Sequence, residues 1–387
     1  MRFRPASAKG EKRRRASSLA ACNQACRARR TTWVSHPPSN LRVYRLIVSL
    51  VWVLLGSLAA ARALAQHDAA HAGGIDPTNI AVIINVADPL SVAVGEYYAR
   101  ARRIPAPQVI RVRFPAGASE LAVDEFRRVK AQVDASTPAA VQAYVLTWAA
   151  PYRVGCMSIT SAFAFGYDRS YCGTGCVPTR LSPYFNSSSR SPARELRMRP
   201  AMMLAGRTFP EIKALIDRGV QSDGTFPRGT AYLLFTKDKA RDSRVPMYPT
   251  VKSVTAGLVN IEILHQDTLV HREDVMFYFT GLASVTGLDT LRFLPGAIAD
   301  HLTSFGGMLT DSTQMSAMKW LEAGATGSYG TVVEPCNFPQ KFANPAIVIG
   351  RYVAGETLIE AYWKSVAWPG QGVFVGEPLA APFMSRR

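Results

Sequence analysis

The sequence of 387 residues predicts an α/β protein, a three-layer sandwich with a mostly parallel sheet and a long cysteine-containing loop excursion. Two observations predict this class. Residues 80–86 (IAVIINV) form an apolar, β-branched run of the kind found in strands that are buried on both faces of a parallel sheet. Strand-like runs then alternate with helix-like segments, which favours βαβ units. A hydrophobic content of 48% is enough for a large core.

The expected elements follow in chain order. Asp88 caps a helix that begins at Pro89, because proline suits the first helical turn and lacks only an N–H that would be unpaired there. Ser119 is expected to cap the second helix. The other elements are expected as strands at 109–114, 143–148, 232–235, 275–279 and from 330, and as helices at 120–133, 210–219 and 313–323. A further helix and strand are expected to end at 300–307, and two helical segments lie near the end of the chain.

The first 65 residues are expected to be a leader for export. Residues 46–61 form an apolar run of about 16 residues, shorter than the roughly 20 that span a bilayer, and Ala63-Leu64-Ala65 is a cleavage signal. We therefore expect a leader at 1–65, a linker at 66–77 and one α/β domain at 78–383 with an irregular insertion at 149–209. The protein would be periplasmic or secreted, with membrane contact only through an uncleaved leader, and the true translation start is open.

Charge is unevenly distributed. The net charge is +17, but residues 1–65 hold 13 of the 45 Lys and Arg residues and 1 of the 28 acidic residues, which leaves 32 basic and 27 acidic residues in the remainder. A nucleic-acid-binding protein concentrates basic residues in a patch or stripe on its working surface. The sequence therefore predicts no nucleic-acid partner.

Four cysteines follow the leader. In an oxidising compartment an even number favours disulfides, and four cysteines allow three pairings. A bridge between Cys172 and Cys176 is easy across a glycine-containing loop, which would leave Cys156 to pair with Cys336. A zinc site and free thiols are the alternatives. No histidine lies near the three upstream cysteines, so we expect no metal.

Several phrases together resemble an uncharacterised family of exported bacterial proteins of about 320 residues. They are residues 96–100 (EYYAR) with 104–105, 144–148 (YVLTW) with 151–152, 218–220 with 222–224, 303–307 (TSFGG), 324–330 (GATGSYG) and 376–379 (GEPL). The resemblance covers nearly all of residues 78–383. It implies an exported protein and brings no assigned activity.

At the level of the fold, the chain is similar to gingipain-type cysteine peptidases, which have a caspase-like α/β fold. The shared features are an opening strand with a Tyr-Tyr helix and Arg-x-Ile-Pro, the small-residue segment 324–330 and a late Gly-Glu-Pro turn. The resemblance implies a His-Gly at one strand end and a Cys at the next. Here these positions read Thr280-Gly281 and 303–307 (TSFGG), so neither catalytic residue is present.

Asp300, His301 and Ser304, followed by Gly306-Gly307, are the strongest candidates for catalysis. A hydroxyl nucleophile needs a base within hydrogen-bond reach and N–H donors for the developing oxyanion, which the two glycines would supply. On a strand, however, His301 would point away from Ser304, and a tight structural turn explains the same residues. The sequence has no G-x-S-x-G elbow.

Cys336, which follows Glu334 at the next strand end, is a candidate thiolate nucleophile as well as a disulfide partner. The charged segment from Asp238 to Arg244 would suit a carboxylate or a cation, but exposed alternating charge is the commoner explanation. Phosphate-loop and dinucleotide-binding fingerprints are missing, so no cofactor is expected.

These residues converge on one prediction about geometry. Parallel strands should deliver residues 280, 304 and 336 to a common edge of the sheet and form one cleft there. Three functions remain open for it: binding of a ligand or of an envelope or extracellular partner, hydrolysis of the peptidase type with Ser304 or Cys336 as nucleophile, and a structural or assembly role in the envelope.

Overall fold

The computed structural model describes residues 74–173, 175–255 and 257–385, which lie in one compact unit. Its centre is a ten-stranded sheet with the strand order β2-β1-β3-β6-β12-β11-β10-β9-β7-β8. The strands of this sheet are β1 (Ile80–Asn85), β2 (Val109–Val112), β3 (Ala143–Leu146), β6 (Ala201–Met203), β7 (Thr230–Phe235), β8 (Asn260–His265), β9 (Arg272–Thr280), β10 (Leu291–His301), β11 (Gly327–Thr331) and β12 (Gly372–Gly376).

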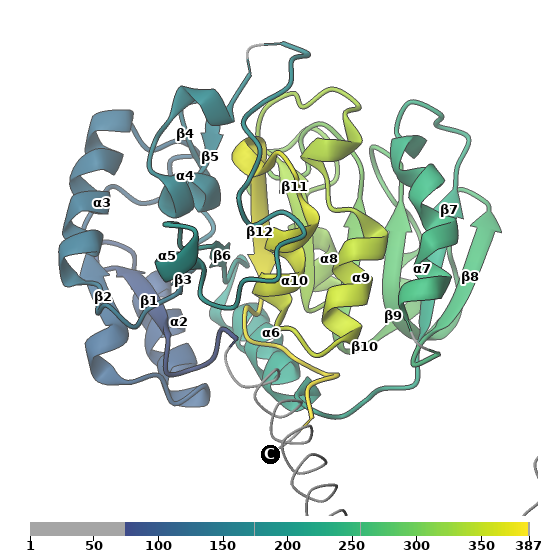
Figure 1. The fold of residues 1–387 in the computed structure, drawn as a ribbon, viewed down its shortest axis with the longest axis horizontal. Coiled ribbons are helices and arrows are strands. Elements are labelled where there is room, and N and C mark those ends of the chain that lie inside the picture. Colours follow the sequence, from purple (N-terminus) through teal and green to yellow (C-terminus); the bar gives the residue numbers. More distant parts are fainter. Residues whose placement is uncertain (1–73, 174, 256, 386–387) are drawn as a thin grey trace, which may run out of the picture. The chain divides into compact units, whose positions relative to one another are not determined.

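Helices cover both faces of the sheet (Figure 1). The helices are α2 (Pro89–Ala101), α3 (Val123–Ser136), α4 (Ile159–Phe165), α5 (Pro192–Glu195), α6 (Phe209–Ser222), α7 (Tyr248–Val254), α8 (Met318–Glu322), α9 (Pro345–Val353) and α10 (Leu358–Ser365). Helices α7, α9 and α10 pack side by side on one face, and α2 packs against α6 on the other. The described residues therefore form a three-layer α/β sandwich, which confirms the predicted fold class. Its caspase-like character stays a prediction.

The sheet is mostly parallel. Neighbouring strands pair in parallel from β2 through β1 and β3 to β6, and again from β11 through β10, β9 and β7 to β8. Strand β12 is antiparallel to β11, with Gly327 opposite Gly376 and Thr331 opposite Gly372. Because β7, β9, β10 and β11 run in one direction, the loops that follow them meet at one edge.

The first βα unit forms as predicted. Every residue of β1 is buried, because helices cover both faces of the sheet. Asp88 caps α2 by accepting a hydrogen bond from the backbone N–H of Leu90 at 2.9 Å, and Pro89 occupies the first helical turn. In this unit the local signals of the sequence agree with the tertiary packing.

The predicted irregular insertion at 149–209 is wrong in part, because the segment contributes to the sheet. It holds the two-stranded hairpin of β4 (Arg153–Val154) and β5 (Met157–Ser158), helices α4 and α5, and strand β6. Strand β6 lies between β3 and β12 in the central sheet. With three residues, β6 is too short to show an alternating pattern in the sequence.

Three other expectations need correction. Helix α3 begins at Val123 rather than at Glu120, and Ser119 instead accepts a hydrogen bond from the N–H of Tyr152 through its carbonyl. Helix α8 is confined to Met318–Glu322, because the preceding segment forms a hydrogen-bonded loop. Strand β8 was not predicted. It is an edge strand with mostly exposed residues, so it lacks a buried face to mark it.

The predicted leader at 1–65 and most of the linker lie outside the described residues, so both stay predictions. Among the residues that are described, no helix combines the length and the apolar character needed to cross a membrane.

Candidate ligand-binding site at the carboxyl edge of the sheet

A pocket of about 290 Å³ lies where the loops after β7, β10 and β11 meet. Its walls combine apolar groups with polar side chains. The lining residues are Cys176, Ala240, Arg241, Leu302, Thr303, Ser304, Glu334, Cys336, Asn337 and Phe342. We call this hollow the rim pocket. Its volume suits one or two side chains of a ligand rather than a large cofactor, since small-molecule sites occupy roughly 300–1,000 Å³.

The structure brings two of the three strand ends that the sequence analysis linked into one pocket. Ser304, which follows β10, and Cys336, which follows β11, line the same pocket. Thr280 lies opposite His301 in the β9–β10 register, and its carbonyl accepts a hydrogen bond from the N–H of Leu302 at 3.0 Å. Thr280 is buried and does not line the pocket, so the prediction that residue 280 shares this cleft is wrong.

Asp300 is the acidic partner of a buried ion pair. Its Oδ1 accepts a hydrogen bond from Arg244 at 2.7 Å, and both side chains are 0–1% exposed. Arg244 also donates to the carbonyls of Thr280 and Ala343, which ties the loop after β7 to two other segments. Burial raises the pKa of Asp300, while the neighbouring guanidinium opposes this rise. Because its charge is committed to Arg244, Asp300 is a structural residue rather than a member of a catalytic triad.

His301 uses both ring nitrogens for structural hydrogen bonds. The indole N–H of Trp320 donates to its Nδ1 at 2.8 Å, which leaves Nε2 to donate to the carbonyl of Met315 at 3.0 Å. Full burial lowers the pKa of His301 to about 4, so the ring is neutral at pH 7. A general base for Ser304 needs an unoccupied nitrogen near the hydroxyl. The predicted role of His301 as that base is therefore wrong.

Ser304 is half-buried at the wall of the rim pocket, and its carbonyl accepts a hydrogen bond from the hydroxyl of Thr331 at 2.8 Å. The N–H of Gly307 donates to the carbonyl of Thr331 at 2.9 Å and is not available to an oxyanion. A Cβ at Gly330 would lie 2.3 Å from the carbonyl carbon of Gly306, so glycine is needed for this close approach. The segment 303–307 thus forms a tight structural turn, and a nucleophilic role of Ser304 stays a prediction.

The four cysteines form two disulfides, with a pairing that differs from the expected one. Cys156 is bonded to Cys172, and Cys176 is bonded to Cys336. Loop closure costs only slightly more free energy as a loop grows longer, so nearness along the chain is a weak guide to pairing. The second bridge joins the 149–209 segment to the loop after β11, at the wall of the rim pocket. Bonded in this way, Cys336 has no thiolate to act as a nucleophile.

The polar side of the rim pocket is held by ion pairs and hydrogen bonds. Arg241 donates to Asp238 at 2.6 Å and to the hydroxyl of Thr303 at 3.3 Å, and its side chain is 28% exposed. Glu334 accepts a hydrogen bond from the N–H of Cys336 at 2.7 Å. The predicted charged segment after β7 therefore contributes Arg241 to the pocket, while Asp238 orients it.

Sequence reasoning missed Lys341 beside this pocket. Its side chain is buried, and its ammonium group has no hydrogen-bond partner among the described residues. Burial lowers the pKa of Lys341, and the carboxylate of Glu334 partly opposes this effect. A lysine that follows Pro-Gln in a polar loop gives no sign of burial in the sequence, so no signal could have identified it.

Within residues 74–173, 175–255 and 257–385, no three His, Cys, Asp or Glu side chains gather in a way that would hold a metal ion.

Comparisons with known proteins give one distant similarity of fold. No family model matches the chain, and no curated protein matches it. A solved structure described as "Structure of Protease" is similar with a TM-score of 0.47 and 10% sequence identity, over 80% of this chain and 79% of that chain. A similarity of this extent gives no support to a shared activity.

Proposed function

We propose that the protein is an extracytoplasmic binding protein whose rim pocket takes an extended peptide segment of an envelope or extracellular partner. In this proposal an apolar side chain of the ligand inserts between Ala240, Leu302 and Phe342. The ligand's backbone amides bond to Arg241 and Asn337. The two disulfides favour an oxidising compartment, in agreement with an exported protein.

One observation carries the proposal. Ser304 and Cys336 line one pocket, but the imidazole that would activate Ser304 and the sulfur of Cys336 are both engaged in other bonds. His301 is held by Trp320 and Met315, and the sulfur of Cys336 is held by Cys176. A pocket with mixed apolar and polar walls, beside which both ring nitrogens of His301 are already bonded, is suited to binding rather than to hydrolysis.

The test is binding of a mixture of N-acetylated, C-amidated tripeptides, observed by saturation-transfer NMR. Ala240 is an exposed residue at the rim, and the indole of Ala240→Trp would fill the pocket. We therefore expect the saturation-transfer signals of the peptides to disappear in this variant. Thr310→Trp places the same bulk at an exposed residue of a different hollow and should leave the signals intact. Equal binding by both variants would contradict the proposal.

The hydrolase alternative makes a different prediction for the same protein. A fluorophosphonate probe would label Ser304 if its hydroxyl were activated, and the label would be lost in Ser304→Ala. We expect no increase in intact mass with this probe. Labelling that maps to Ser304 would replace the binding function with a hydrolytic one. The envelope structural role requires neither binding of tripeptides nor labelling.

A further inference from the structure

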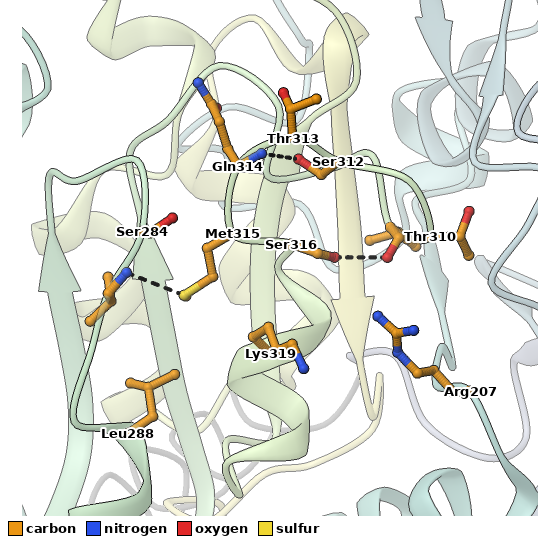
Figure 2. Close-up of a pocket in the computed structure, with 12 residues that line it drawn as sticks. Arg207, Ser284, Leu288, Thr310, Ser312, Thr313, Gln314, Met315, Ser316 and Lys319 are labelled. Atoms are coloured by element: carbon orange, nitrogen blue, oxygen red, sulfur yellow. Dashed lines mark hydrogen bonds between the residues drawn. The ribbon is translucent and has the colours of Figure 1, made fainter.

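A second and larger hollow is lined by residues further along the segment that follows β10. Its volume is about 400 Å³, and its walls come from the loops after β6, β9 and β10 and from α8. Figure 2 shows the side chains arranged around it, with Ser284 and Leu288 on one side and Arg207 on the other. This volume falls within the range of small-molecule sites. We call it the α8 pocket.

Two cations face the α8 pocket and share a single carboxylate. The guanidinium of Arg207 lies 3.3 Å from Glu322, and the ammonium of Lys319 lies 2.6 Å from the same side chain. Their side chains are 56% and 51% exposed. No Asp or Glu is among the twelve described residues that line the pocket, so the lining itself carries two positive charges. Exposed ion pairs contribute little free energy, and a ligand's anion can therefore compete with Glu322.

The part of the wall formed by residues 312–316 is fixed by hydrogen bonds. The amide oxygen of Gln314 accepts from the hydroxyl of Thr303 at 2.7 Å and from the N–H of Phe305 at 2.8 Å. Ser316 donates to the carbonyl of Leu309 at 2.9 Å. His301 holds the carbonyl of Met315 from behind, so this wall is shaped before a ligand arrives. Such preorganisation lowers the entropic cost of binding.

The remaining surface combines hydroxyl groups with an apolar patch. Ser284, Thr310 and Thr313 present exposed side chains at the mouth of the pocket. Val285 and Met315 are buried beneath it, and the N–H of Val285 donates to the sulfur of Met315 at 3.4 Å. A ligand that fits this surface needs an anionic end for the cations and a short apolar body for the patch.

We propose that the α8 pocket binds a small organic anion, a carboxylate or phosphate group on a short aliphatic body. Arg207 and Lys319 hold the oxyanion group, since guanidinium and ammonium groups are the usual protein donors to both anions. Val285 and Met315 contact the aliphatic part. The two pockets share no lining residue.

The experiment is isothermal titration calorimetry of the full chain at low ionic strength with two probes, 4-methylpentanoate and isobutyl phosphate. We expect saturable binding of at least one probe and none of the neutral 4-methylpentanamide. Lys319→Met and Arg207→Met should each weaken binding about tenfold, because each removes one charge-assisted hydrogen bond. The probe that binds more tightly identifies the anionic group as carboxylate or phosphate.

Arg292→Met is the matched control, because Arg292 is an exposed cation paired with Glu273 that does not line the α8 pocket. It removes the same charge and should leave the affinity unchanged, as should Ala240→Trp in the rim pocket. Circular dichroism confirms that the variants are folded. Equal weakening by Arg292→Met, unchanged affinity in Lys319→Met and Arg207→Met, or no binding of either anion at about 10 mM would overturn the proposal.

Discussion

At the scale of single residues, the end of β10 carries two groups that look catalytic but are committed to structure. Asp300 and Arg244 form an ion pair that is almost completely removed from solvent. Burying two charges has a large desolvation cost, and their attraction offsets this cost only while both partners are present. Removal of one partner leaves an uncompensated charge in the core between the sheet and the helices.

Asp300→Asn should therefore lower the free energy of unfolding by about 3–5 kcal/mol. The measurement is urea denaturation followed by fluorescence. The double variant Asp300→Leu/Arg244→Met removes both charges and should recover most of this loss. If Asp300→Asn unfolds at the same urea concentration as the wild type, the ion pair does not have the structural role assigned to it.

His301 gives a prediction about pH. Its pKa in the folded protein is about 4, below the ordinary histidine value of 6.5. The unfolded chain therefore binds a proton between pH 6.5 and 4 while the folded protein does not, and unfolding becomes easier as the pH falls through this window. The contribution of His301 to stability is complete above pH 6.5 and falls by roughly 3 kcal/mol by pH 4.

His301→Gln isolates this effect, because an amide can both accept from Trp320 and donate to Met315 without titrating. As the pH is lowered from 7 to 4.5, the unfolding free energy of the wild type should fall relative to that of His301→Gln. A difference that stays constant over this range would show that His301 is protonated in the folded protein at the same pH as in the unfolded chain.

At the scale of elements, the Cys176–Cys336 disulfide anchors the long 149–209 segment to the loop after β11. Cys176→Ser/Cys336→Ser should lower the free energy of unfolding by about 3–5 kcal/mol, because this bridge constrains a long stretch of the unfolded chain. Peptide mapping without reduction should recover the pairs 156–172 and 176–336. Recovery of a 172–176 peptide would contradict the pairing and detach this segment from the rim pocket.

Elements with strong local signals could be predicted, and those fixed by distant partners could not. β1 and the Asp88-capped α2 follow from an apolar run and a proline, whereas β6 and β8 depend on neighbouring strands for their hydrogen bonds. The sequence also identified Ser304 and Cys336 as neighbours, because both follow parallel strands. It could not predict Arg244 as the partner of Asp300, since 56 residues separate them.

At the scale of the whole described body, hydrogen bonds join the loops after β7, β10 and β11 to one another. Arg244 from the first loop bonds to Asp300 at the end of β10, and Thr331 at the end of β11 bonds to the carbonyl of Ser304. These contacts place Ala240, Ser304 and Asn337 around one hollow. A ligand seated there must touch segments that lie almost one hundred residues apart in the sequence.

Hydrogen exchange measured by mass spectrometry, with and without the tripeptide that binds most tightly, tests this arrangement most directly. We predict slower exchange in residues 237–242, 302–306 and 334–337 together, with residues 312–319 of the α8 pocket unchanged. Protection confined to one of these three segments, or found only in residues 312–319, would contradict the account, because the three loops would then not share a binding site.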